Sequence, residues 1–116
     1  MDERILKWLY DIDFAINEID SYFEGEEKDF SNYKKNTMLK RAIERDLEII
    51  GEAVNRILNR DTSFGHKISD AKSIIGLRNQ VIHAYDNVSD ENIWSILINH
   101  LPKLKKEVSK LISESK

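Results

Sequence analysis

Residues 5–23 read ILKWLYDIDFAINEIDSYF, and their spacing decides the fold. Large apolar residues recur at alternating steps of four and three: Ile5, Leu9, Ile12, Ile16, Ile19 and Phe23. This spacing places them on one face of a helix. A second stripe at steps of seven contains Trp8, Ala15 and Tyr22, so we expect the helix to contact more than one neighbour. Gly25 and the polar residues after it predict that the helix ends near residue 24.

The same period predicts a second long helix from about Asn36 to Asn59, with this apolar set: Leu39, Ile43, Leu47, Ile50, Val54 and Ile57. Between the two helices, residues 25–35 are expected to form a polar loop anchored by Phe30 and Tyr33. Residues 61–65 form another loop by composition. A third helix is predicted from near Ser69 to about Tyr85, with Ile74, Ile75, Val81 and Ile82 as core positions.

The last part of the chain predicts two more helices. Ser89 is expected to cap the first of them, and its buried face is predicted to contain Ile93, Trp94, Leu97 and Ile98. Pro102 suits the first turn of the final helix, whose inward residues are predicted to be Leu104, Val108, Leu111 and Ile112. No strand pattern competes. The sequence therefore predicts an all-α fold, a four- to five-helix up-and-down bundle that forms one domain over residues 1–116.

Composition limits the function classes. The chain has 116 residues, no cysteine and a formal net charge of -3. It lacks an apolar run of membrane-spanning length and a signal peptide pattern, so we expect a cytoplasmic protein with no membrane partner. The three histidines (His66, His83 and His100) are too far apart in sequence for a local ligand pair, so no metal site and no cofactor are expected.

The charge distribution is uneven. Eight acidic residues lie between Asp11 and Asp29 against Lys28 alone, whereas the last helix is rich in lysine. Two solvated helix faces explain this most simply. The alternative is an acidic face for a basic partner and a basic rim for RNA. Because the total charge is negative, any RNA contact has to be local.

The residues best suited to catalysis lie in one segment, Arg78-Asn79-Gln80-Val81-Ile82-His83-Ala84-Tyr85. Arginine is a planar cation suited to phosphate, and histidine can exchange protons near neutral pH. His83 can take the proton of an RNA 2′-hydroxyl or give one to the leaving 5′-oxygen, while Arg78 holds the phosphate. Asn79 and Tyr85 are candidate supporting residues. The segment thus favours phosphate-ester chemistry without a metal, and RNA is the leading substrate.

Helical geometry places the two candidate catalytic residues, Arg78 and His83, on different faces of the helix. In an ideal helix the directions of Arg78 and His83 differ by roughly 140°. Either the helix loosens near its end or a second copy of the chain completes the site. We favour a symmetric homodimer that brings Arg78 of one copy to His83 of the other.

Acidic residues of the second helix are candidate partners of Arg78. Asp46 lies on the apolar face, where a buried carboxylate needs a partner, and Arg78 is one candidate. The alternative is that Asp46 occupies a partly exposed groove position. Glu52, which follows Gly51, is another residue that can reach Arg78. A plain structural ion pair, with His83 merely hydrogen-bonded in a helix, is the competing interpretation of the same residues.

Several segments resemble a known family. Arg78–Tyr85 looks like the arginine, four-residue gap, histidine, tyrosine signature of HepT-like toxins, a branch of the HEPN-domain ribonucleases. Residues 41–53, 73–79 and 88–94 resemble the family's second helix, the lead-in to its active site and the segment after it. One departure is Asp70-Ala71, which stands where family members often have proline and tryptophan.

The resemblance implies a homodimeric HEPN-type bundle and a metal-independent endoribonuclease with Arg78 and His83 as the catalytic pair. It also implies a type VII-like toxin–antitoxin pair, in which a minimal nucleotidyltransferase antitoxin adds AMP to Tyr85. The added bulk and negative charge would block RNA. The alternative is a HEPN-fold partner of a nucleotidyltransferase that binds nucleotide or RNA without cutting it.

Overall fold

The computed structural model describes residues 1–24, 26–83 and 89–115, with the backbone alone for residues 80–83. Within these ranges the chain is helical and contains no strand, which confirms the predicted all-α class. The elements in chain order are α1 (Glu3–Ser21), α2 (Phe30–Lys35), α3 (Thr37–Arg60), the 3-10 helix η1 (Thr62–His66), α4 (Ala71–His83), α5 (Asp90–Ser95), the π-helix η2 (Ile96–His100) and α6 (Leu101–Glu114).

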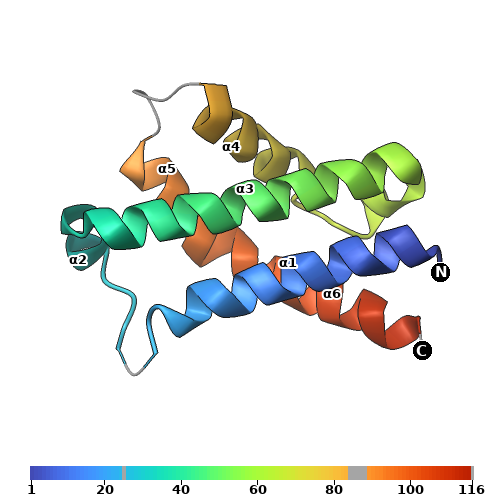
Figure 1. The fold of residues 1–116 in the computed structure, drawn as a ribbon, viewed down its shortest axis with the longest axis horizontal. Helices are drawn as coiled ribbons and strands as arrows, with labels where there is room; N and C mark the ends of the chain where they lie inside the picture. The colour runs from blue at the N-terminus through green and yellow to red at the C-terminus, as the bar shows by residue number, and fades with distance from the viewer. Residues whose placement is uncertain (25, 84–88, 116) are drawn as a thin grey trace.

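The two long helices α1 and α3 form the centre of the bundle. They run antiparallel, with α4 against the other side of α3 and α6 against α1 (Figure 1). The α1 face predicted from spacing is buried, since its five aliphatic positions are at most 2% exposed: Ile5, Leu9, Ile12, Ile16 and Ile19. Inward positions of α3 and α6 are buried as predicted, including Ile43, Ile50, Val54, Leu104 and Val108. Burial of these stripes against one another is what holds the helices in place.

Polar side chains fix several helix ends. The carboxylate of Asp2 accepts the amide hydrogens of Arg4 and Ile5 at the start of α1, and the Asn36 side chain accepts that of Leu39 in α3. Ser89 caps α5 by accepting from the Asn92 amide, as predicted. Each cap satisfies a backbone donor that the helix itself leaves free.

The region between the two long helices differs from the prediction in two respects. Helix α1 ends at Ser21, because Tyr22 and Phe23 donate to carbonyls three residues back instead of four. The predicted loop contains the short helix α2, which Asp29 caps. Tyr33, predicted as an anchor, is fully buried and packs against Trp94 with ring centroids 5.1 Å apart.

A wide turn joins the last helices, so α5, η2 and α6 follow one another without a loop. Pro102 stands in the first turn of α6 as predicted. Proline has no amide hydrogen and its ring presses on the preceding turn, which accounts for the π-type widening before it. The widened turn changes which residues face inward. Ile98 was expected to be buried and is 40% exposed, whereas Ile96 is buried in its place.

Helix α4 begins at Ala71, two residues later than predicted. At this point Asp70 accepts hydrogen bonds from the His100 ring and Lys103, which tie the start of α4 to η2 and α6. The pKa of the Asp70 carboxyl is lowered, chiefly by its hydrogen bond with His100. The predicted end of this helix at Tyr85 lies outside the described residues, as do the side chains of Val81 and Ile82.

Candidate functional site

Helices α3 and α4 come into very close contact beside Arg78. A Cβ atom added to Gly51 of α3 would lie 2.3 Å from the Arg78 Cβ and 3.3 Å from the Ile74 carbonyl oxygen. No side chain fits in that space, so only glycine permits this approach. Glycine within a helix costs about 1 kcal/mol relative to alanine. Because Gly51 has no side chain, the Cβ of Arg78 packs directly against the backbone of α3.

The Arg78 guanidinium is held from two directions. Its Nη2 donates to Glu52 Oε2 at 2.5 Å, and its Nη1 donates to Asn79 Oδ1 at 2.9 Å. The Nε atom is buried and has no hydrogen-bond partner within the described part of the chain. The Arg78 side chain as a whole is 23% exposed. These contacts fix its orientation while leaving part of the cation open to a ligand.

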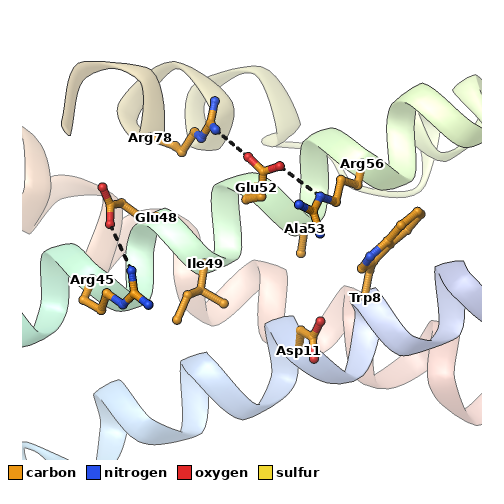
Figure 2. A pocket seen from close by; sticks show the side chains of 9 residues that line it. All are labelled: Trp8, Asp11, Arg45, Glu48, Ile49, Glu52, Ala53, Arg56 and Arg78. Atoms are coloured by element: carbon orange, nitrogen blue, oxygen red, sulfur yellow. Dashed lines mark hydrogen bonds and ion pairs between the residues drawn. The ribbon is translucent and has the colours of Figure 1, made fainter. Parts of the chain in front are cut away.

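Glu52 also binds a second arginine. Arg56, one turn further along α3, donates its Nε to Glu52 Oε1 at 2.9 Å. One carboxylate therefore stands between two guanidinium groups, as Figure 2 shows. Since one negative charge faces two positive ones, this cluster has a local excess of positive charge, which suits an anion such as phosphate.

A groove extends from this cluster toward α1 (Figure 2). Its volume is about 340 Å³. Trp8 and Asp11 line it from α1, Ile49 and Ala53 line it from α3, and Arg78 lies at its α4 side. Charged and apolar surfaces thus alternate within one concave site.

Asp46, one candidate partner of Arg78, does not pair with it. Asp46 is buried at 2% exposure, but it faces α1, where its Oδ2 lies 2.9 Å from the Tyr22 hydroxyl. The same hydroxyl lies 3.1 Å from Glu18 Oε1. Asp46 points away from α4 because α3 is packed between two helices, and position 46 belongs to the face that α1 covers. Burial, opposed by the Tyr22 hydrogen bond, raises the pKa of Asp46 to about 6.

The described residues include only part of the predicted catalytic segment. The backbone of His83 forms the last residue of α4, and its side chain is outside the description. Tyr85 lies outside the described residues altogether. Arg78, Asn79 and Glu52 are brought together, whereas Asp46 is not part of this cluster.

The lysine-rich last helix is largely paired within the chain. Lys103 contacts Asp70 and Lys105 contacts Asp20, at 3.2 Å in each case. These contacts favour the simpler interpretation, a solvated helix face, over a basic rim for RNA. No group of three or more potential metal ligands was found among the described residues. In the same ranges no helix is long and apolar enough to cross a membrane.

Comparison with known proteins identifies the family. The family model "Ribonuclease HepT-like" matches residues 12–111, which is most of the chain. The chain belongs to the HepT-like ribonuclease family. A protein of Methanocaldococcus jannaschii named "Putative RNase" is 37% identical over 111 residues, covering 93% of this chain and 97% of its own. A Caldanaerobacter subterraneus protein of the same description is 36% identical over 87 residues, covering 75% and 77%. No solved structure was found to match.

Three residues of the candidate site were not expected from the sequence. Trp8 was placed in the second stripe of the first helix, Gly51 was noted only as the neighbour of Glu52, and Arg56 was not named as a site residue. A signal existed for Gly51 alone, because an isolated glycine inside a strongly amphipathic helix often marks close packing. The positions of Trp8 and Arg56 depend on how α1 and α3 lie together, which spacing does not reveal.

Proposed function

We propose that this chain is a metal-independent endoribonuclease that cleaves cellular RNA, with Arg78 and His83 as its catalytic pair. The observation that supports this best is the fixed guanidinium of Arg78. Gly51 brings its helix close and Glu52 orients it, at the edge of a groove in a chain of a ribonuclease family. A cation held in place before the substrate arrives stabilises developing phosphate charge without further reorganisation.

The reaction that these residues suit is transesterification. The RNA 2′-oxygen attacks the adjacent phosphorus as His83 removes its proton, and the bond to the 5′-oxygen breaks. The protonated His83 then gives a proton to the leaving 5′-oxygen. The products are a 2′,3′-cyclic phosphate and a free 5′-hydroxyl. Arg78 offsets the negative charge that builds on the phosphate oxygens, and Asn79 holds the guanidinium from its other side.

The active form in this proposal is a homodimer. Arg78 and His83 are five residues apart on α4, and their directions in a regular helix differ by roughly 140°. Two copies related by a two-fold axis can place Arg78 of one beside His83 of the other.

Regulation in this proposal acts on Tyr85. A minimal nucleotidyltransferase antitoxin would transfer AMP from ATP to its hydroxyl and release pyrophosphate, in a type VII-like toxin–antitoxin pair of the cytoplasm. The modified residue would place a bulky anion close to Arg78 in sequence, where it competes with the RNA phosphate.

The experiment that tests the function is RNA cleavage in excess EDTA by wild type, His83→Ala and Arg78→Ala, each checked by mass spectrometry for AMP on Tyr85. We expect wild type alone to cut and to leave 2′,3′-cyclic phosphate ends. If unmodified wild type binds RNA but leaves it intact, the chain is instead a non-catalytic nucleotide- or RNA-binding partner of a nucleotidyltransferase.

A further inference from the structure

The groove beside Arg78 has features that phosphate-ester chemistry alone does not require. Trp8 is only partly buried and packs against the core from α1, and it lines the groove together with Ile49. A ring held from behind by the core and open on its other side is a rigid surface on which a base can stack. Ile49 is 37% exposed, which is unusual for a large aliphatic residue of this helix.

The charges along the groove are arranged unevenly. Asp11 is paired with Lys7 at 2.8 Å, and Glu48 lies 3.8 Å from Arg45. Glu52, in contrast, is shared between Arg56 and Arg78. The excess positive charge therefore lies at the end of the groove next to the proposed catalytic arginine.

Arg56 is well placed to bind an anion. Its Nε is used by Glu52, and among the described residues its two terminal amino groups have no hydrogen-bond partner. Its side chain is 56% exposed. Because Arg56 and Arg78 bind the two oxygens of one carboxylate, their guanidinium groups are close enough to contact neighbouring phosphates of one RNA strand.

We propose that this groove is a binding site for the nucleotide next to the cleaved phosphate, in which Arg56 binds its phosphate and Trp8 stacks on its base. The proposal rests on the ribonuclease function and extends it from the reacting phosphate to the adjacent part of the strand. A groove of about 340 Å³ lies within the range of small-ligand sites and is large enough for one nucleotide. Stacking accepts every base, so we expect single-stranded RNA to be bound with little sequence preference.

The test measures binding separately from cleavage. The probe is a short single-stranded oligoribonucleotide with methylated 2′-hydroxyls, which cannot be cut by the proposed mechanism, and its affinity is measured by fluorescence anisotropy. Trp8→Ala should weaken binding about tenfold, since stacking on an aromatic ring contributes roughly 1–3 kcal/mol per base. Trp8→Phe, which keeps an aromatic ring, should recover most of that loss. Phe14→Ala is the matched control, because Phe14 is an exposed aromatic residue of the same helix outside the groove.

Arg56 is tested in the same way. Arg56→Ala should weaken binding several-fold at low salt, and it should reduce the slope of log affinity against log salt by about 0.7, as expected for one phosphate contact on a single strand. Arg60→Ala is the control, because Arg60 is on the same helix, pairs with Asp2 and does not line the groove. Equal affinities for wild type, Trp8→Ala and Arg56→Ala would show the proposal to be wrong.

Cleavage of unmodified RNA distinguishes the two proposals. If wild type cuts RNA and the groove variants bind the probe normally, the groove assignment fails while the ribonuclease function stands. If Trp8-dependent binding occurs without any cleavage, the groove binds a nucleotide of single-stranded RNA, but the ribonuclease function fails. If tryptophan fluorescence changes with protein concentration in wild type but not in Trp8→Ala, and the probe does not bind, a second copy of the chain covers the groove and the assignment is wrong.

Discussion

Gly51 determines how closely α3 and α4 approach at Arg78. We expect Gly51→Ala to destabilise the protein by roughly 2 kcal/mol, since its new methyl group would overlap the Arg78 Cβ and force the helices apart. Cleavage should fall by about tenfold or more, because the guanidinium would be displaced from its working position. Urea unfolding followed by circular dichroism, together with cleavage rates, measures both effects.

Matched variants separate this contact from a general effect of alanine. Gly76→Ala, on α4 with nothing within 4 Å of the added atom, should be neutral or slightly stabilising. In an Arg78→Gly background the clash disappears and Gly51→Ala should cost little, whereas Arg78→Ala keeps the Cβ and therefore the cost. If Gly51→Ala destabilises the Arg78→Gly protein as much as the Arg78→Ala protein, the proposed contact is wrong.

At the scale of the elements, the packing of α1 on α3 includes a carboxyl–hydroxyl cluster. Tyr22 has one hydroxyl proton but lies within hydrogen-bond distance of both Asp46 and Glu18. It can donate to only one of them at a time, so a protonated Asp46 that donates back to Tyr22 satisfies the whole cluster. Burial is the main cause of the raised pKa of Asp46, and the nearby Glu18 carboxyl adds to it, whereas the hydrogen bond from Tyr22 acts in the opposite direction.

This cluster makes stability depend on pH. The pKa of Asp46 is about 6 in the folded chain against an ordinary value of 3.8, so between these values the folded state holds more protons than the unfolded state. The stabilisation is therefore fully present below about pH 4 and is lost as pH rises through 6. Relative to Asp46→Asn, which accepts from Tyr22 but does not titrate, wild type should lose about 2 kcal/mol over this range. Urea unfolding of both proteins at a series of pH values measures the difference, and a constant difference would refute the prediction.

At the scale of the whole molecule, the main question is whether two copies share each proposed pair of Arg78 and His83. Arg78→Ala and His83→Ala are each expected to be inactive alone. If the pair is formed across a two-fold axis, mixing the two variants should restore about a quarter of wild-type activity, because half the dimers are mixed and each mixed dimer has one intact site of two.

The mixing experiment needs two controls, which are the mass of each protein in solution and proof that the two variants exchange subunits. Light scattering should give the mass of a dimer for wild type and for each variant. Should mixing restore nothing although mixed dimers form, Arg78 and His83 act within one chain, and α4 must depart from regular helix geometry near its end.

The family assignment and the fold agree with what the sequence predicts. Positions of the long helices, the cap at Ser89 and the inward faces of α1, α3 and α6 follow from residue spacing, since the helical period is a local property of the chain. The prediction for Ile98 is wrong because a single wide turn before Pro102 shifts the phase of that period. The short helix α2 was missed because six residues are too few to show a period.

Residue spacing alone predicts an all-α chain, and residue types alone favour phosphate chemistry in the segment that contains Arg78. Only the tertiary structure decided which acid Arg78 meets, since Glu52 and Asp46 are both on α3 but face different neighbouring helices. The packing of the helices also decided that Gly51 lies against the Cβ of Arg78 and that Trp8 lines the same groove as Arg56. The physical reason is that a helix period specifies which residues share a face, whereas the packing of helices against one another specifies what each face meets.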